Sequence, residues 1–333
     1  MKAAVLYGIN EPLKIEDVAT PDLASGEVLV KLKAASLNKR DWWIQKGQYA
    51  GLKFPIIVGS DGAGIVAAAG ENADNHLIGK EAVIYFIDNW GNDERFQSKE
   101  AALLGLPANG CLAEYVKVKA GQIFPKPDNL SFEETAALPV AGVTAYRALF
   151  AKGNCKAGDK VLISGVGGGA GTFALQFAVA AGAEVWVTSG SEEKIKKAVA
   201  LGAKGGVNYK TESWDKALLE QAGEFDVVID SALGDGFAKL MDVTARGGRV
   251  VFFGGTNGNI PPLNGRSIFW KQISILGTTG GSPKDFAAML SFIEEKNIHP
   301  VIDEVFPLNE AENAMRTMDN AGNKFGKIVV QIA

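Results

Sequence analysis

The amino-acid sequence predicts an α/β protein in which a β-rich domain precedes a domain built on a doubly wound parallel sheet. Short strand-like runs broken by Gly, Pro and Asn dominate residues 1–125. Strand-like and helix-like runs alternate over residues 126–276, a pattern typical of parallel sheets with crossover helices. The length of 333 residues also suits two domains rather than one.

The first predicted domain is expected to form an irregular β-barrel. Its strand-like runs cover residues 28–32, 56–58, 81–86 and 112–118. The segment 88–97 is polar and shows no period, so we expect an exposed loop there.

The second predicted domain begins with a helix whose start is marked by Ser131, followed three residues later by Glu134. Helices are expected at 192–201 and 237–244, and strands at 227–230, 249–253 and 273–276. The tail, about 277–333, adds helices at 285–295 and 310–318 and strands at 301–306 and 327–332. No helix follows the last strand, so we expect this tail to complete the first domain.

A cluster of glycines at residues 165–171 carries the clearest functional signal. It follows a buried-type strand at 161–163 and precedes a helix at 172–181 and a second strand at 185–188. Glycines let the backbone approach a pyrophosphate closely, and the N–H groups at the helix start face the anion. We therefore predict a dinucleotide site; the alternative is a turn that only packs helix on sheet.

Composition excludes several classes of function. The net charge of −4 gives no basic surface for nucleic acid, and no run is long enough to span a membrane. The first residues are too short an apolar run for a signal peptide, so a cytoplasmic location is the default expectation. The two cysteines argue against a disulfide framework and exclude a structural four-cysteine zinc site.

Several longer motifs together resemble one superfamily. They are MKAAV at 1–5, AASLNKRD at 34–41, PIIVGSDGAG at 55–64, GCLAEY at 110–115, LPVAGVTAY at 138–146 and GKIV at 326–329. With the order of elements, they resemble the medium-chain dehydrogenase/reductases. The resemblance implies a GroES-like β-rich catalytic domain and a Rossmann domain for a nicotinamide dinucleotide.

The departures from that family indicate a subclass. Zinc-dependent members carry Cys at the position of Asn38 and His-Glu at Ser60-Asp61, and their third ligand aligns near Val140. A lobe with four cysteines is replaced here by residues 88–108. The chain therefore resembles the zinc-free branch, with quinone reductases and reductases of activated double bonds, and no metal is expected.

The cofactor is predicted to be NADPH. NAD enzymes usually place an acid at the end of the second strand, where this chain has Ser189. Ser189 and Ser191 can donate hydrogen bonds to a 2′-phosphate, and Lys194 can supply charge. The resemblance adds Tyr209 to this group. Alternatively, Lys194 lies on a solvated helix face and Tyr209 is a half-buried aromatic.

Further cofactor residues are predicted from the ends of strands and from the family. The glycine loop of the zinc-free branch corresponds to Gly165, Gly168, Gly169, Ala170 and Gly171. The family places the nicotinamide beside two later segments, which correspond here to Gly254, Gly255 and Thr256 and to Gly277 and Thr278. It also places a threonine, here Thr144, near the carboxamide of the nicotinamide. Tight turns without a ligand are the alternative for the two segments.

Four residues are candidates for the catalytic side by family position: Asn38, Asp41, Tyr49 and Ser60. Hydrogen-bond donors could suffice to stabilise the delocalised charge left by hydride addition. Asp41 could instead be structural, and Tyr49 could be exposed. Trp42 and Trp43 could form an apolar wall for a flat substrate or belong to the core. No dedicated general acid is visible, so the final proton would come from water.

The predicted function is a zinc-free, NADPH-dependent reduction of a quinone or an α,β-unsaturated carbonyl. A nucleotide-binding sensor or structural protein without turnover is the alternative from another class. A zinc alcohol dehydrogenase with unusual ligands is a third possibility. A homodimer is also expected, because the strand at 273–276 would leave an apolar sheet edge.

Overall fold

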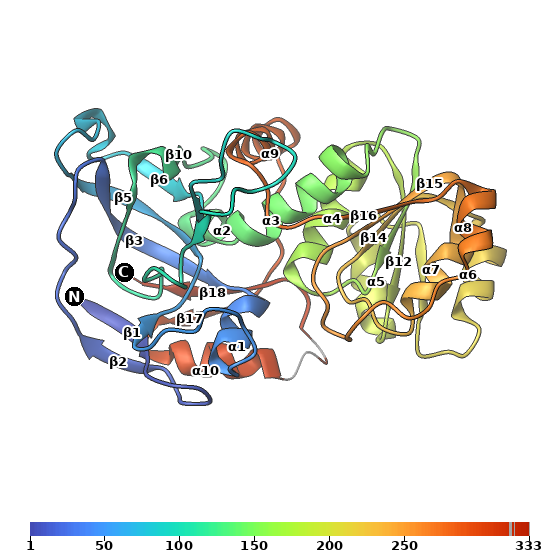
Figure 1. The fold of residues 1–333 in the computed structure, drawn as a ribbon, viewed down its shortest axis with the longest axis horizontal. Helices are drawn as coiled ribbons and strands as arrows, with labels where there is room; N and C mark the ends of the chain where they lie inside the picture. The colour runs from blue at the N-terminus through green and yellow to red at the C-terminus, as the bar shows by residue number, and fades with distance from the viewer. Residues whose placement is uncertain (320–321, 323, 333) are drawn as a thin grey trace. The chain divides into compact units, whose positions relative to one another are not determined.

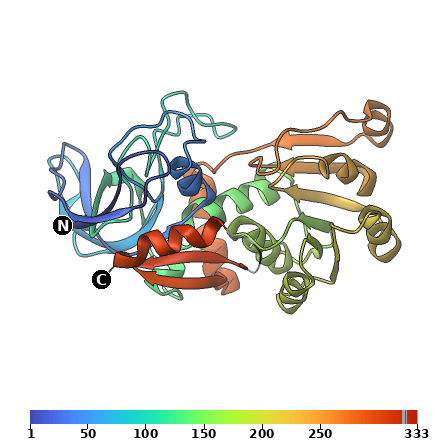
Figure 2. The ribbon, with the colours of Figure 1, turned by 90° about the horizontal axis from the view of Figure 1, so that it is seen from below.

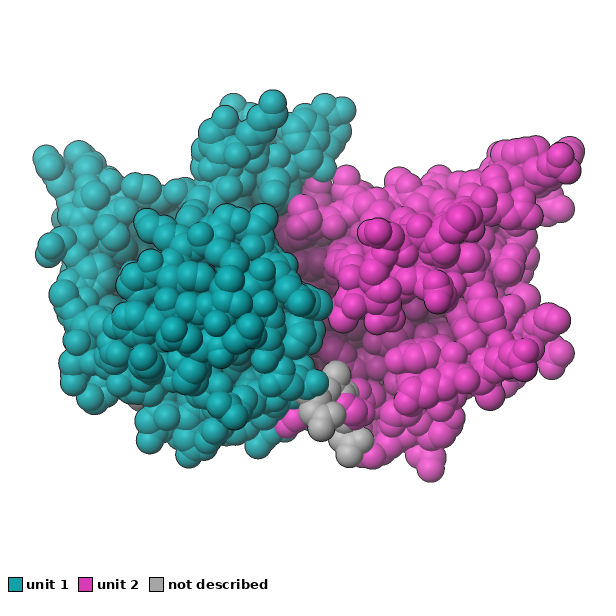
Figure 3. All heavy atoms as spheres, turned by 60° about the horizontal axis from the view of Figure 1, so that its bottom comes forward, with its two compact units in different colours: residues 1–140, 282–321, 327–333 teal, residues 141–281, 322–326 magenta. Residues whose placement is uncertain are grey.

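The computed structural model describes residues 1–319, 322 and 324–332, which form two compact units, coloured separately in Figure 3. Unit 1 comprises residues 1–140, 282–321 and 327–333, and unit 2 comprises residues 141–281 and 322–326. The sequence places the first boundary near residue 125, whereas the structure keeps residues 126–140 in unit 1. The reason is helix α2 (Phe132–Ala136), which packs on three strands of unit 1.

A seven-stranded sheet forms the frame of unit 1, and Figure 1 labels most of its strands. Its order is β10-β6-β5-β3-β18-β17, and β9 also pairs with β3. The strands are β3 (Glu27–Leu37), β5 (Asp61–Ala69), β6 (Glu81–Ile84), β9 (Tyr115–Lys119), β10 (Ile123–Pro125), β17 (Ile302–Pro307) and β18 (Lys327–Gln331). The last strand, β18, pairs antiparallel with β3 of unit 1.

Smaller elements complete unit 1. A three-stranded sheet contains β1 (Lys2–Leu6), β2 (Lys14–Asp17) and β4 (Ile56–Ile57). The helices include α1 (Lys39–Gln45), α9 (Pro283–Lys296) and α10 (Ala311–Arg316). Helix α10 packs on β17 and β18, beside which it runs in Figure 2.

The prediction of an exposed loop at 88–97 is wrong in part. The segment begins in a two-stranded sheet of β7 (Ile87–Asp88) and β8 (Ala102–Leu103), and Trp90 is only 3% exposed. The Trp90 indole N–H donates to the carbonyl of Asp93 at 3.1 Å, so the ring is buried with its polar atom satisfied.

Unit 2 contains a six-stranded, wholly parallel sheet in the order β13-β12-β11-β14-β15-β16. The chain enters at the centre, runs out to β13, and returns to β14 on the other side of β11. The strands are β11 (Lys160–Ser164), β12 (Glu184–Ser189), β13 (Gly205–Asn208), β14 (Phe225–Asp230), β15 (Thr244–Phe252) and β16 (Ser274–Gly277). The predicted doubly wound sheet is confirmed.

Helices connect these strands and pack against the sheet. They are α4 (Gly169–Ala180), α5 (Glu192–Ala200), α6 (Trp214–Ala222), α7 (Phe237–Val243) and α8 (Gly265–Lys271). Helix α3 (Pro139–Tyr146), which continues as a π-helix over Arg147–Lys152, leads into the sheet. Among the described residues, no helix is both long and apolar enough to cross a membrane.

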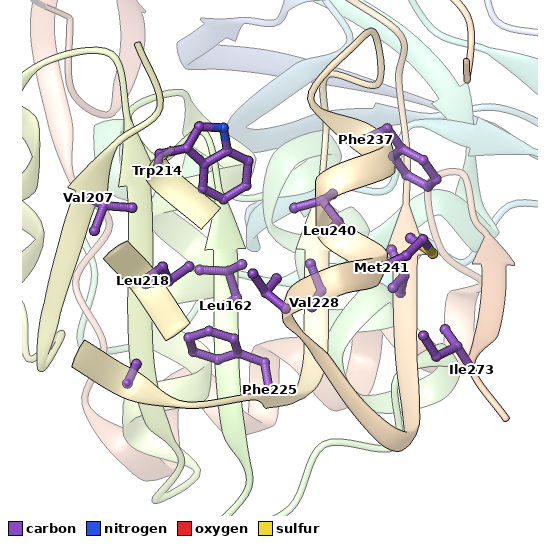
Figure 4. Packing of buried hydrophobic residues seen from close by; sticks show 13 residues of the cluster. Leu162, Val207, Trp214, Leu218, Phe225, Val228, Phe237, Leu240, Met241 and Ile273 are labelled. Atoms are coloured by element: carbon purple, nitrogen blue, oxygen red, sulfur yellow. The ribbon is translucent and has the colours of Figure 1, made fainter. Parts of the chain in front are cut away.

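The core between the sheet and helices α6 and α7 is shown in Figure 4. Leu162, Val228 and Val250 rise from the strands and are fully buried, while Leu218 and Leu240 meet them from the helices. Each such side chain contributes roughly 1.5–3 kcal/mol through its burial. Leu162 and Val250 lie in β11 and β15, so this core packs against two strands that lead into predicted cofactor segments.

Candidate functional site

The glycine loop of unit 2 has the backbone geometry that a dinucleotide site needs. Gly165 and Gly167 adopt positive φ values of 73° and 143°, which side chains disfavour. The Gly165 N–H donates to Thr188 Oγ1 at 3.0 Å, so the next strand holds the loop in place. Gly168 is the N-cap of α4 without a side-chain cap, which leaves N–H groups of the first turn available to a ligand.

The other predicted cofactor residues lie at the same edge of the sheet. All six strands are parallel, so the segments after β11, β12, β13, β15 and β16 leave from their common carboxyl edge. The structure thus brings together Gly165, Gly168, Gly169, Ala170, Gly171, Ser189, Ser191, Tyr209, Gly254, Gly255, Thr256, Gly277 and Thr278. Lys194 lies in α5, and Thr144, which is 8% exposed, lies in α3. Their roles in binding stay predictions.

The end of β12 is built to bring polar side chains close to the backbone. A Cβ on Gly190 would lie 2.8 Å from Tyr209 Oη and 2.9 Å from Lys210 Cε, so both side chains lie directly against this glycine. A Cβ on Gly167 would lie 3.0 Å from Lys194 Cδ, so the Lys194 side chain packs directly against the glycine loop. Sequence reasoning missed Lys210, although it directly follows Tyr209.

Two buried polar groups, Thr278 Oγ1 and the Asp230 carboxyl, lie at the ends of β16 and β14. Thr278 Oγ1 is buried and has no hydrogen-bond partner within the described part of the chain. An orphaned hydroxyl of this kind fits a site that a polar ligand completes. Asp230, at the end of β14, is 3% exposed, and burial raises the pKa of its carboxyl despite hydrogen bonds from Leu233 and Ala232.

In unit 1, Asn38 belongs to a buried polar cluster centred on Asp61. The Asp61 Oδ2 atom accepts hydrogen bonds from Ser36 Oγ at 2.8 Å, Asn38 Nδ2 at 2.7 Å and Lys327 Nζ at 2.9 Å. Asp61 Oδ1 accepts from the Val140 N–H at 2.8 Å. The Lys327 ammonium also donates to Asn38 Oδ1 at 2.7 Å and to the Leu37 carbonyl at 2.9 Å.

These residues do not fit a catalytic zinc ion. Such an ion takes three protein ligands, usually from His, Cys and carboxylates. Asp61 is the one acid among the aligned positions, and its carboxylate is already paired with the Lys327 ammonium. Over residues 1–319, 322 and 324–332, no cluster of three or more His, Cys, Asp or Glu could hold a metal.

Ser60 and Tyr49 meet at Arg40 rather than at Asn38. The Arg40 guanidinium donates to Ser60 Oγ and, at 2.6 Å, to the Leu104 carbonyl. It also lies 5.1 Å from the centre of the half-buried Tyr49 ring. The structure therefore places these two candidates around one buried cation, and their catalytic roles stay predictions.

Asp41 is held as a structural group. Its carboxylate is fully buried and accepts the N–H groups of Asn38 at 2.8 Å and Gly59 at 3.1 Å. Burial raises the pKa of this carboxyl, and the nearby Arg40 charge opposes that shift. These contacts cap α1 and tie it to the segment before Ser60, as the structural alternative supposes; a catalytic role stays a prediction.

The two tryptophans of α1 are half-buried. Their rings meet edge to face with centroids 4.6 Å apart, and the Trp42 indole N–H donates to Asp319 at 2.6 Å. Lys39 Nζ lies 3.5 Å from the centre of the Trp42 ring. The pair is therefore anchored by polar contacts at the surface of unit 1 instead of filling its core.

Two dehydrogenase family models match this chain. A zinc-binding dehydrogenase family model matches residues 169–295, and an alcohol dehydrogenase GroES-like domain model matches residues 24–128. A zinc-type alcohol dehydrogenase-like protein of Schizosaccharomyces pombe is 39% identical, over 97% of this chain and 96% of its own. The quinone oxidoreductase of Mus musculus is 30% identical, over 97% of this chain and 95% of its own.

Solved structures agree with this assignment. A crystal structure of an NAD-dependent alcohol dehydrogenase has 36% identity and a TM-score of 0.93, with complete coverage of both chains. The carboxylase reductase CinF, in complex with NADP and 2-octenoyl-CoA, has 28% identity and a TM-score of 0.87, over 96% of this chain and 82% of its own. The chain therefore belongs to the medium-chain dehydrogenase/reductases, oxidoreductases with a GroES-like domain and a Rossmann domain that binds a nicotinamide dinucleotide.

Proposed function

We propose that the protein is a zinc-free, NADPH-dependent reductase of quinones or α,β-unsaturated carbonyls. The observation that carries the proposal is the ion pair between Lys327 and Asp61. Asp61 is the one acid among the aligned metal-ligand positions, and its carboxylate is neutralised by the lysine. Relatives named for quinone reduction and for enoyl-CoA substrates support the substrate class.

The chemistry suits a site without a metal. The cofactor supplies a hydride, and the acceptor then carries negative charge delocalised over a quinol or enolate oxygen. Hydrogen-bond donors can stabilise such an oxyanion, and in unit 1 the Asn38 carboxamide is the proposed donor. A simple ketone concentrates the charge on one oxygen and gains more from a Lewis acid.

NADPH is proposed over NADH because the end of β12, where NAD enzymes usually carry an acid, is Ser189. Ser189 is 2% exposed and donates to the Val166 carbonyl, while Ser191, Lys194, Tyr209 and Lys210 lie beyond it. A 2′-phosphate would meet hydroxyls and two cations there instead of an acid. A similar structure is named as NAD-dependent, so the experiment compares both cofactors.

The test measures oxidation of NADPH and NADH by the purified protein, with benzoquinone, an alkenal and an enoyl-CoA as acceptors. Metal content is measured on the same sample before and after treatment with a strong chelator. We expect turnover with NADPH, less with NADH, and no change on chelation. Zinc at one atom per chain, with activity lost on its removal, would overturn the zinc-free mechanism.

The same experiment separates the alternatives. Binding of NADPH without oxidation by any acceptor would favour a sensor or structural protein. NAD-linked oxidation of simple alcohols that requires zinc would favour an alcohol dehydrogenase. A homodimer that joins the β16 edges of two copies is also proposed.

A further inference from the structure

We propose that Lys327 and Asp61 are positioning residues that fix the Asn38 carboxamide as the hydrogen-bond donor to the acceptor's oxyanion. The inference rests on the proposed reductase function and adds two residues to it. In this arrangement, the lysine ammonium and the aspartate carboxylate hold one side chain from opposite ends.

The two neighbours leave the amide only one orientation. An ammonium can only donate, so the Asn38 atom 2.7 Å from Lys327 Nζ must be the oxygen. A carboxylate can only accept, so the Asn38 atom 2.7 Å from Asp61 Oδ2 must be the nitrogen. Flipping the amide would place NH₂ against NH₃⁺ and oxygen against carboxylate.

This orientation leaves one hydrogen of Asn38 Nδ2 for a ligand. The first hydrogen is used by Asp61, and no second acceptor lies within hydrogen-bond distance among the described residues. Asn38 is 9% exposed, whereas Asp61 is 0% and Lys327 is 3% exposed. Within the cluster, the amide is therefore the group that a substrate oxygen can reach most easily.

The buried ion pair also strengthens the donor. An ammonium against the amide oxygen polarises the carboxamide, which makes its N–H groups better donors. Lys327 Nζ is itself saturated by the Leu37 carbonyl, Asn38 and Asp61, so its charge acts through the amide. The donor is fixed in place before the substrate arrives, which is what an oxyanion site requires.

The test is a double-mutant cycle on Asn38→Ala and Lys327→Met. Two quantities are measured for the four proteins: kcat with a quinone, and the affinity of the NADP⁺ complex for a substituted phenolate that mimics the oxyanion. We expect Asn38→Ala to lower kcat by roughly 10²-fold to 10³-fold. Lys327→Met should lower it by about 10-fold to 100-fold in the native background and by less than threefold in the Asn38→Ala background.

A purely structural role for Lys327 would give a different pattern. Lys327→Met would then reduce kcat by the same factor in both backgrounds, and that additivity would overturn the proposal; a lower melting temperature is expected in either case, because Asp61 loses its partner. The affinity for NADPH should stay unchanged in all four proteins. If Lys327→Met does not fold, the pair Lys327→Met with Asp61→Asn replaces it, because that pair leaves no unpaired charge.

The phenolate measurement separates this inference from the proposed function. If the native protein reduces no acceptor, the proposed function fails, but the cycle can still be read from phenolate binding. The positioning role would be supported if Lys327→Met lowers phenolate affinity in the native background but hardly in the Asn38→Ala background. It would be rejected if Lys327→Met lowers phenolate affinity by the same factor in both backgrounds.

Discussion

Lys327 shows how a single residue can be buried with its charge intact. Burial disfavours an ammonium, and its side chain is only 2% exposed. It is tolerated because three oxygens surround it, from Leu37, Asn38 and Asp61. Removing either charge alone would leave the other buried and unpaired. Because both charged groups also hydrogen-bond to Asn38, a replacement for Asn38 would have to provide one acceptor and one donor.

The choice between cofactors should depend on Lys194. We expect Lys194→Ala to raise the KM for NADPH roughly tenfold or more and to leave that for NADH nearly unchanged, because a contact to a phosphate is lost. Lys197→Ala is the matched control, since this lysine lies on the same helix and pairs with Glu193 at 3.2 Å. Equal effects of Lys194→Ala on both cofactors would contradict the assignment.

Both cysteines should be inert in the native protein. Burial raises the pKa of Cys155 to about 11 and that of Cys111 well above its usual value. At pH 8 the thiolate of Cys155 would then be about one part in a thousand, so an aromatic disulfide should react with neither residue at an appreciable rate. In guanidinium both should react quickly. A fast-reacting thiol in the native state would contradict this burial.

At the scale of elements, caps decide where helices begin. Ser282 starts α9 with a capping box: its Oγ accepts from the Asp285 N–H at 3.1 Å, and Asp285 accepts from the Ser282 N–H at 2.9 Å. Ser131 and Glu134 form the same device at α2, as the sequence predicted. In α2, which has five residues, the capped first turn is most of the helix.

Ser282→Ala should lower the free energy of unfolding by about 1 kcal/mol, because the Asp285 N–H loses its acceptor Oγ and the Asp285 carboxylate loses the hydroxyl donor. Urea denaturation of the variant and the native protein measures it. Ser213→Ala is the control, since Ser213 occupies the N-cap of α6 without a side-chain hydrogen bond to the helix. An equal loss in both variants would show that the capping bond is not the cause.

At the scale of the whole molecule, local patterns were predictable and distant pairings were not. The unit of β11, α4 and β12 depends on neighbouring residues, and its glycines mark it in the sequence. The pairing of Lys327 with Asp61 joins residues 266 apart, which no local pattern indicates. Strand β13 was missed because it starts with Gly205 and Gly206, which have low β-propensity. Their lack of side chains leaves room for Trp186 and Val187.

The outer edge of the parallel sheet suggests how the molecule assembles. Strand β16 pairs only with β15 among the described strands, so its other edge has unpaired N–H and C=O groups. Close by in sequence, Phe269 and Trp270 at the end of α8 are 60% and 70% exposed. Exposed aromatics beside an open strand edge are typical of an interface.

We therefore expect the native protein to sediment as two chains and Trp270→Glu to sediment as one, because a carboxylate would be buried at the joint edge. Phe96→Glu is the matched control, since Phe96 is 59% exposed but belongs to unit 1, and it should leave the assembly intact. NADPH affinity, measured on both variants, should be unchanged if only the assembly is affected. A native protein that sediments as a single chain at micromolar concentration would contradict the dimer. The unpaired N–H and C=O groups of β16 would then be exposed to solvent in the free chain.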